Sequence, residues 1–109
     1  MSRAIAIVIH PGFQLLDAAG PSMAFEIAER FQPGSYDLAL LAAGGGEVES
    51  SSGFRLAAEP LSEGSIDTII VSGGEVARSM VALEETVAWL RRTTARQTSA
   101  PEARVRDWV

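Results

Sequence analysis

The residues most able to bind a ligand lie in two loops, each of which follows an apolar run. Asp17 comes after the run Arg3–Ile9, and Gly73-Gly74 ends the run Thr68–Ser72 abruptly. In an open α/β sheet, ligands bind beyond the carboxyl ends of the strands, where the strand order reverses. The two loops therefore predict a ligand-binding site that contains Asp17, Gly73 and Gly74.

Each of these residues also has a structural interpretation. Asp17 stands close to Gly20-Pro21, and an aspartate in such a place commonly accepts hydrogen bonds from loop amides or caps a helix. Gly73-Gly74 permits a tight turn after a buried strand. The residues alone leave the ligand role and the structural role of Asp17 open.

His10 and Ser50–Ser52 are the other residues whose types could do chemistry. His10, the only histidine, would be needed for any Ser-His-Asp pairing, but it stands directly before Pro11 with no placed nucleophile beside it. We therefore expect His10 to line the pocket or to have a structural role. A turn between two short strands explains the serines better than a nucleophile cluster does.

The composition excludes several kinds of site. The 109 residues contain no cysteine, which rules out a disulfide, a thiolate metal site and a cysteine nucleophile. Neither "AAGGGE" nor "SGGEVA" has the glycine spacing of a dinucleotide or phosphate loop, so we predict no cofactor and no metal. The net charge of -5 disfavours direct binding to nucleic acid or to an anionic membrane. No apolar run approaches the roughly 20 residues that span a bilayer, and we expect a cytoplasmic protein.

Hydrophobic patterning predicts the elements that must hold these loops. The apolar runs Arg3–Ile9, Tyr36–Ala43 and Thr68–Ser72 are typical of parallel strands that are buried on both faces. Gly20-Pro21 predicts a helix start, because proline at the first helical position loses no hydrogen bond, and the helix should reach Phe31. We expect its sheet-facing side to be formed by Ala24, Ile27, Ala28 and Phe31.

Two further elements complete the pattern. Short strands at Glu47–Glu49 and Phe54–Ala57 flank "SSSG", which predicts a hairpin at the edge or end of the sheet. A second helix should follow Gly73-Gly74, with a break allowed near Ala82. Its apolar side would contain Val76, Met80, Leu83, Val87 and Leu90.

Three stretches of the sequence resemble one superfamily. "IVIHPGFQLLDAAGP", "SSSGFRL" and "DTIIVSGGE" resemble the ThiJ/PfpI superfamily, which is class I glutamine amidotransferase-like, and most closely the N-terminal domain of GlxA-type regulators of the AraC family. The resemblance implies an α/β fold, a flavodoxin-like three-layer sandwich with a parallel sheet, present as a partial domain over residues 3–96 and incomplete at the C-terminus. It also implies that Asp17 faces a cysteine on an elbow just after Arg96, where this sequence has none, and that amides at Gly73-Gly74 help to hold an oxyanion.

Residues 97–109 depart from this pattern. Their sequence, "QTSAPEARVRDWV", has neither a strand pattern nor a helix face, although another buried strand is due there. We interpret them as a tail outside the family that is either out of frame or disordered. Without the expected strand, Thr68–Ser72 would be an apolar edge with unpaired backbone groups, and we expect self-association into a homo-oligomer.

The sequence therefore predicts a sensor domain rather than an enzyme. The chain would bind an unidentified small molecule and dimerise as a truncated part of a GlxA-type transcriptional regulator that lacks its DNA-binding domain. The alternative is a fragment of a ThiJ/PfpI-type cysteine hydrolase or of an enzyme resembling isonitrile hydratase, which requires a thiol that the chain does not contain. A plain flavodoxin-like binding module fits less well, because the sequence has no phosphate loop.

Overall fold

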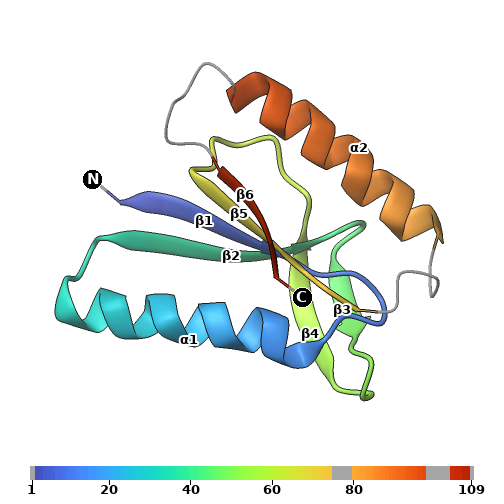
Figure 1. Cartoon of the computed structure of the whole chain (residues 1–109), viewed down its shortest axis with the longest axis horizontal. Helices are drawn as coiled ribbons and strands as arrows, with labels where there is room; N and C mark the ends of the chain where they lie inside the picture. The colour runs from blue at the N-terminus through green and yellow to red at the C-terminus, as the bar shows by residue number, and fades with distance from the viewer. Residues whose placement is uncertain (1, 75–79, 98–103, 109) are drawn as a thin grey trace.

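A six-stranded sheet lies between two helices, one on each face (Figure 1). The computed structural model describes residues 2–74, 80–97 and 104–108. The strand order is β3-β4-β2-β1-β5-β6, and every pairing is parallel except that of β3 with β4. The elements are β1 (Arg3–Val8), α1 (Leu15–Phe31), β2 (Tyr36–Ala42), β3 (Gly46–Glu49), β4 (Arg55–Pro60), β5 (Thr68–Ser72), α2 (Met80–Gln97) and β6 (Arg104–Trp108). This arrangement confirms the predicted α/β sandwich with a parallel sheet.

Strand β1 is buried on both faces and pairs with β2 on one side and with β5 on the other. Ile5 and Ile7 belong to the core cluster on the α1 side, whereas Ala6 and Val8 belong to the cluster on the α2 side. Successive residues of a strand point to opposite faces, so a strand between two helix layers needs apolar residues at every position. This requirement explains the unbroken apolar run at the start of the sequence.

Helix α1 begins at Leu15, so the expected start at Gly20-Pro21 is wrong. Pro21 lies inside the helix and is buried, and the predicted end at Phe31 is confirmed. Leu15 and Ala18 pack against the sheet from the first turn. The free energy gained by burying these side chains outweighs the loss of the backbone hydrogen bond that a proline removes from a helix interior.

The side of α1 that faces the sheet also differs from the expected one. Ile27 is 43% exposed and Phe31 is 86% exposed, whereas Leu15, Ala18 and Phe25 pack against the core. Because apolar residues occur on almost every side of this helix, periodicity alone does not select its inner face. The inner face is set by which side chains meet the isoleucines of β1.

Helix α2 covers the opposite face of the sheet. Trp89 belongs to the core cluster on the α2 side of the sheet and is only 1% exposed. Its indole N–H donates a hydrogen bond of 2.6 Å to the carbonyl oxygen of Ser62. The tryptophan therefore joins α2 both to the sheet and to the segment that leads into β5.

Two expectations for α2 are corrected. The helix runs without interruption from Met80 to Gln97, so there is no break near Ala82. The expected apolar side is correct only in part, since Leu90 packs on the core while Met80 and Val87 are exposed. Val76 lies outside the described residues.

The predicted hairpin is confirmed and belongs to the main sheet. Strands β3 and β4 are antiparallel, with Val48 opposite Leu56, and β4 continues into a short parallel pairing in which Leu41 of β2 lies opposite Glu59. The hairpin therefore extends the sheet beyond β2 and places its turn at the same end as the loop that follows β1 (Figure 1).

Strand β6 corrects the expectation that no strand lies within residues 97–109. Arg104–Trp108 pair in parallel with β5, with Thr68 opposite Arg104 and Ser72 opposite Trp108. A polar sequence can form this strand because the ladder uses backbone groups, which every non-proline residue supplies. Strand β5 is therefore not an edge strand. The expected self-association can no longer be argued from unpaired backbone groups on β5. The interpretation of residues 97–109 as a tail outside the family stays a prediction.

The turn between α1 and β2 is held by one carboxylate. Glu29 accepts hydrogen bonds from the backbone N–H groups of Gly34 at 2.7 Å and of Ser35 and Tyr36 at 3.0 Å each. These donors, Gly34 first, lower the pKa of Glu29 from its ordinary value of 4.5. A group whose pKa is lowered by folding stabilises the protein above its ordinary pKa, and this stabilisation is lost as the pH falls through the lowered value.

We predict that Glu29→Gln lowers the stability of the chain at neutral pH and has little effect in acid. The carboxamide keeps one acceptor oxygen where the carboxylate offers two, and the protonated wild type loses the same advantage. The measurement is the urea midpoint of both proteins as a function of pH. Glu26→Gln is the control, because Glu26 only forms an exposed ion pair with Arg30. A midpoint difference for Glu29→Gln that is independent of pH would contradict the assignment.

Candidate functional site

The candidate site lies at the carboxyl ends of β1 and β5. After β1 the chain crosses by α1 to β2 on one side, and after β5 it crosses by α2 to β6 on the other, so the strand order reverses between β1 and β5. In open α/β sheets, such a reversal is the place where ligands usually bind. The structure brings all four predicted site residues, His10, Asp17, Gly73 and Gly74, to this place.

Asp17 bonds directly to the glycine loop. Its Oδ2 accepts a hydrogen bond of 3.0 Å from the backbone N–H of Gly73, and the carbonyl oxygen of Gly73 accepts one of 2.9 Å from the N–H of Gln14. Asp17 lies in the first turn of α1, which the early start of that helix makes possible. The carboxylate therefore has the structural role considered from the sequence, and the N–H of Gly73 already donates to it. A ligand role for Asp17 stays a prediction.

Gly74 lies in backbone contact with the loop after β1. A Cβ atom at this position would lie 2.3 Å from the carbonyl oxygen of Gly12 and 2.7 Å from the Cα of Phe13, and the φ of Gly74 is 144°. Gly74 and Phe13 also form an isolated antiparallel bridge. Glycine is therefore required here both for its conformation and for the close approach of the two loops.

The His10 side chain contacts the end of β5 from the loop that follows β1. It is 7% exposed, and its Nε2 lies 3.1 Å from the carbonyl oxygen of Ser72 at the end of β5. The Nδ1 of His10 lies 3.2 Å from the carbonyl oxygen of Pro11, and the ring nitrogen that carries the proton donates to the carbonyl oxygen beside it. Ser72 is buried as well, and its hydroxyl donates to the carbonyl oxygen of Val8 at 3.1 Å. These contacts give His10 a structural position beneath the two loops.

Sequence reasoning missed that the β3–β4 turn forms a third wall of the site. The N–H of Gly12 donates to the carbonyl oxygen of Glu49 at 2.8 Å, and the N–H of Ser51 donates to the carbonyl oxygen of Phe13 at 2.7 Å. Phe13 is fully buried between these loops. An aromatic residue directly after Pro11-Gly12 was the one signal in the sequence that this loop is packed rather than open.

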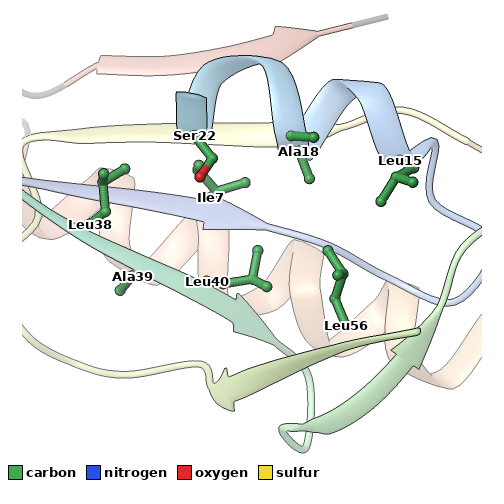
Figure 2. A pocket seen from close by; sticks show the side chains of 9 residues that line it. Ile7, Leu15, Ala18, Ser22, Leu38, Ala39, Leu40 and Leu56 are labelled. Carbon is green, nitrogen blue, oxygen red and sulfur yellow. The ribbon is translucent and has the colours of Figure 1, made fainter. Parts of the chain in front are cut away.

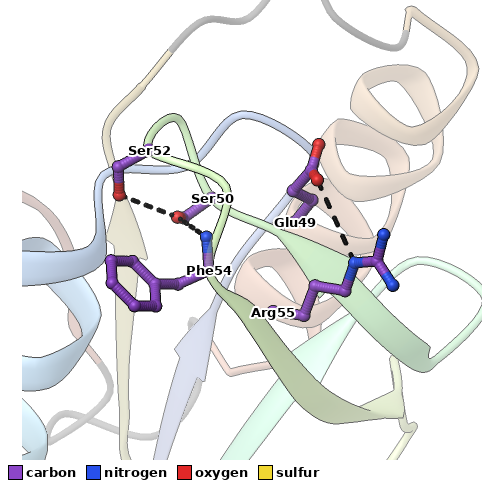
Figure 3. Close-up of polar contacts among 5 residues, drawn as sticks. All are labelled: Glu49, Ser50, Ser52, Phe54 and Arg55. Atoms are coloured by element: carbon purple, nitrogen blue, oxygen red, sulfur yellow. Dashed lines mark hydrogen bonds and ion pairs between the residues drawn. The ribbon is translucent and has the colours of Figure 1, made fainter.

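The serines of this turn have the structural role that the sequence favours. Ser50 is buried, and its Oγ accepts a hydrogen bond of 3.1 Å from the N–H of Phe54 and lies 3.2 Å from the Oγ of Ser52 (Figure 3). The side chains of Glu49 and Arg55 face each other across the hairpin, with 4.0 Å between Glu49 Oε2 and Arg55 Nε (Figure 3). The Ser50 hydroxyl is therefore used to close the turn.

Strand β6 lies next to β5, so its carboxyl end is at the same edge of the sheet as the candidate site. Its last described residue, Trp108, lies opposite Ser72, whereas Arg96 lies within α2. The position just after Arg96, where the resemblance implies a cysteine elbow, is therefore helical and far along the chain from the carboxyl end of β6. An elbow at the end of this strand would follow Trp108.

Within the described residues, no group of three or more histidine, aspartate or glutamate side chains could hold a metal ion. No helix in that part of the chain is long and apolar enough to cross a membrane. The polar groups at the junction of the loops after β1 and β5 include one carboxylate, backbone amides and carbonyls, and a buried imidazole.

An apolar groove lies beside α1, on the face of the sheet that this helix covers only in part. It has a volume of about 450 Å³ and lies between α1 and strands β1, β2 and β4 (Figure 2). Its lining is almost wholly apolar and includes Ile7, Leu15, Ala18, Leu38, Leu40 and Leu56. It offers hydrophobic contact but no titratable group, so it is a packing groove rather than a reaction site.

Comparison with known proteins gives the fold. No protein-family model matches the chain, and no curated protein matches it. Among solved structures, an AraC family transcriptional regulator from Pseudomonas putida covers 94% of this chain at 20% identity with a TM-score of 0.73. A DJ-1 superfamily protein from Agrobacterium tumefaciens covers 96% at 16% identity with a TM-score of 0.64. A ThiJ/PfpI domain protein from Brachyspira murdochii covers 96% at 15% identity with a TM-score of 0.60.

The chain has the fold of the DJ-1 and ThiJ/PfpI proteins. This confirms the fold that the sequence resemblance implied. The chain spans 62%, 52% and 57% of the lengths of the regulator, the DJ-1 protein and the ThiJ/PfpI protein, respectively. The DJ-1-like fold is thus shared with structures that extend well beyond the length of this chain.

We predict that Gly74→Ala destabilises this DJ-1-like fold by at least about 3 kcal/mol, because backbone atoms of the neighbouring loop would have to move. Gly34→Ala is the matched control. Gly34 also has a positive φ, 86°, but a Cβ there meets no atom within 4 Å, so only the conformational strain of about 1–2 kcal/mol applies. Urea unfolding at neutral pH measures both. Equal losses in the two variants would show that the loops can separate at little cost.

Proposed function

We propose that this chain acts in the cytoplasm as the ligand-sensing and dimerisation part of a GlxA-type transcriptional regulator, and that it is not itself an enzyme. The proposal includes membership of the ThiJ/PfpI superfamily. The likeness to the P. putida regulator supports the regulator class, and it extends over nearly the whole of this chain. The small-molecule ligand would bind where the loops after β1 and β5 meet.

The observation that carries this proposal is the joint between Asp17 and Gly73 in a chain without cysteine. The loops after β1 and β5 are fixed to each other by backbone and carboxylate hydrogen bonds, which pre-organises the groups at their junction. Covalent catalysis of the thiol type needs a cysteine near the carboxylate, and the sequence supplies none. A pre-organised junction without a cysteine nucleophile is suited to binding and release.

The carboxylate of Asp17 favours ligands that donate hydrogen bonds, because an ionised carboxylate only accepts them. We therefore expect a small amine, amino acid or polyol rather than a phosphate. This chain would not contact DNA directly, in keeping with its net charge of -5.

The test is a thermal-shift screen of the chain with a panel of small amines, amino acids and polyols. A compound that binds the folded state raises the melting temperature. Asp17→Asn should weaken binding of such a compound roughly 10- to 100-fold, since it removes the charge that strengthens the hydrogen bond. The asparagine keeps an acceptor oxygen for the N–H of Gly73, so the loop joint should survive.

Glu47→Gln provides the control, because Glu47 is an exposed carboxylate on β3. It should leave both the melting temperature and the ligand shift unchanged. Ligand shifts that are equal in Asp17→Asn and the wild type would place the binding site elsewhere.

The alternative function is a fragment of a ThiJ/PfpI-type cysteine hydrolase or of an enzyme resembling isonitrile hydratase. Its support is the shared fold of the B. murdochii ThiJ/PfpI domain protein. Hydrolysis of an activated ester and hydration of an isonitrile, each compared between the wild type and Asp17→Asn, distinguish the two functions. Turnover that depends on Asp17 would favour the enzyme, and a background rate in both proteins would favour the sensor.

A further inference from the structure

The apolar groove beside α1 exists because short side chains of the helix face the sheet there. Ala18, Ala19 and Ser22 line the groove from the helix. Leu38 and Leu40 of β2 line it from the sheet, and both are only half-buried. The short side chains of α1 do not reach across to cover these leucines (Figure 2). Part of the apolar face of the sheet is therefore left open beside α1.

The lining of the groove selects for neutral, apolar molecules. Of the nine residues that line it, eight are apolar and none is charged. A charged group that lost its water here would find no partner, which makes its burial costly. Water in such a groove forms few hydrogen bonds with the walls, so its displacement by an apolar molecule is favourable.

Ser22 supplies the one polar side chain of the lining. It projects from α1 toward the strands (Figure 2). Its hydroxyl can donate one hydrogen bond and can also accept them. Sites for small molecules typically combine apolar walls with a few polar groups that fix the orientation of the ligand. The groove therefore suits an apolar molecule that carries one polar group.

The size of the groove favours a small molecule over a protein partner. Its volume of about 450 Å³ lies within the range of roughly 300–1,000 Å³ that is usual for small-molecule sites. A specific protein interface uses about 20–30 residues on each side, whereas nine residues line the groove. The groove is therefore large enough to enclose much of a small ligand and too small to hold another protein by itself.

We propose that the groove beside α1 is a binding site for a neutral, largely apolar small molecule with a single hydrogen-bonding group. The apolar body of the ligand would lie against Leu38, Leu40 and Leu56. Its polar group would form a hydrogen bond with the hydroxyl of Ser22. Asp17 does not line this groove, so the site is separate from the place where the loops after β1 and β5 meet.

This second site goes beyond the proposed function and does not depend on it. The ligand proposed for the loop junction donates hydrogen bonds to Asp17, whereas the groove needs an apolar body. Leu15 and Ala18 line the groove and flank Asp17 in the first turn of α1. A molecule in the groove would therefore hold that turn against the sheet without occupying the other site. Binding in the groove is measured without any amine, amino acid or polyol, so either proposal can fail while the other stands.

The experiment is a titration of the 15N-labelled chain with 2-naphthol, a neutral aromatic alcohol, followed by two-dimensional NMR. The backbone amide signals of Leu38, Leu40 and Leu56 should move, with a dissociation constant on the order of 1 mM or lower. Naphthalene-2-sulfonate has the same rings with a charged group, and it should bind at least about tenfold more weakly. Equal binding of the two compounds would overturn the ligand class, and unmoved signals in the groove would overturn the site.

Three variants locate the bound compound. Ala19→Leu should weaken 2-naphthol binding roughly tenfold or more and raise the urea midpoint, because the larger side chain fills the groove and buries apolar surface. Ser22→Ala should weaken binding about two- to tenfold through the lost hydrogen bond and should not lower stability. Ala24→Leu is the matched control, because Ala24 is exposed on the same helix and does not line the groove. It should leave binding unchanged.

Two further results would contradict the proposal. Binding that Ala19→Leu leaves unchanged, or that Ala24→Leu weakens to the same extent, would place 2-naphthol outside the groove. Groove signals that depend on protein concentration before any compound is added would show that a second copy of the chain covers the groove instead.

Discussion

The loops after β1 and β5 meet at backbone distance, and the arrangement of the polar groups around them depends on that contact. A side chain on Gly74 would collide with the carbonyl oxygen of Gly12, so the two loops can pack in this way only with glycine there. Once the loops are in register, the carboxylate of Asp17 reaches the N–H of Gly73, and His10 reaches the carbonyl oxygen of Ser72. The contact therefore fixes these polar groups through hydrogen bonds of ordinary length.

Much of the fold follows from the sequence because buried parallel strands have a simple signature. The apolar runs that give β1, β2 and β5 are almost continuous, and their ends are predicted to within a residue. The start of α1 was wrong because proline is normally excluded from a helix interior, and here burial of the first turn overrides that preference. Strand β6 was missed for a different reason. Backbone pairing with β5 forms it, and the residue types of Arg104–Trp108 contain no apolar run to announce it.

The site was predictable as a place but not as a set of contacts. The topology of parallel strands requires the loops after β1 and β5 to converge, so Asp17, Gly73 and Gly74 could be grouped from the sequence. The bond from Gly73 to Asp17 depends on where α1 begins, and the start of α1 was not correctly predicted. The contribution of the β3–β4 turn through Ser51 depends on backbone hydrogen bonds, which leave no trace in residue type. The inner face of α1 could not be chosen from periodicity because apolar residues occur on almost every side of that helix.

The packing of Trp89 gives this molecule a built-in optical reporter. The indole is enclosed in the core between α2 and the sheet, and its N–H is committed to the carbonyl oxygen of Ser62. Water that reaches this ring must first separate α2 from the segment leading into β5. The fluorescence of Trp89 will therefore shift to longer wavelength when that helix undocks, before or together with global unfolding. Once Trp108, the second tryptophan of the chain, is replaced by phenylalanine, local opening on the α2 side of the sheet can thus be followed without any attached label.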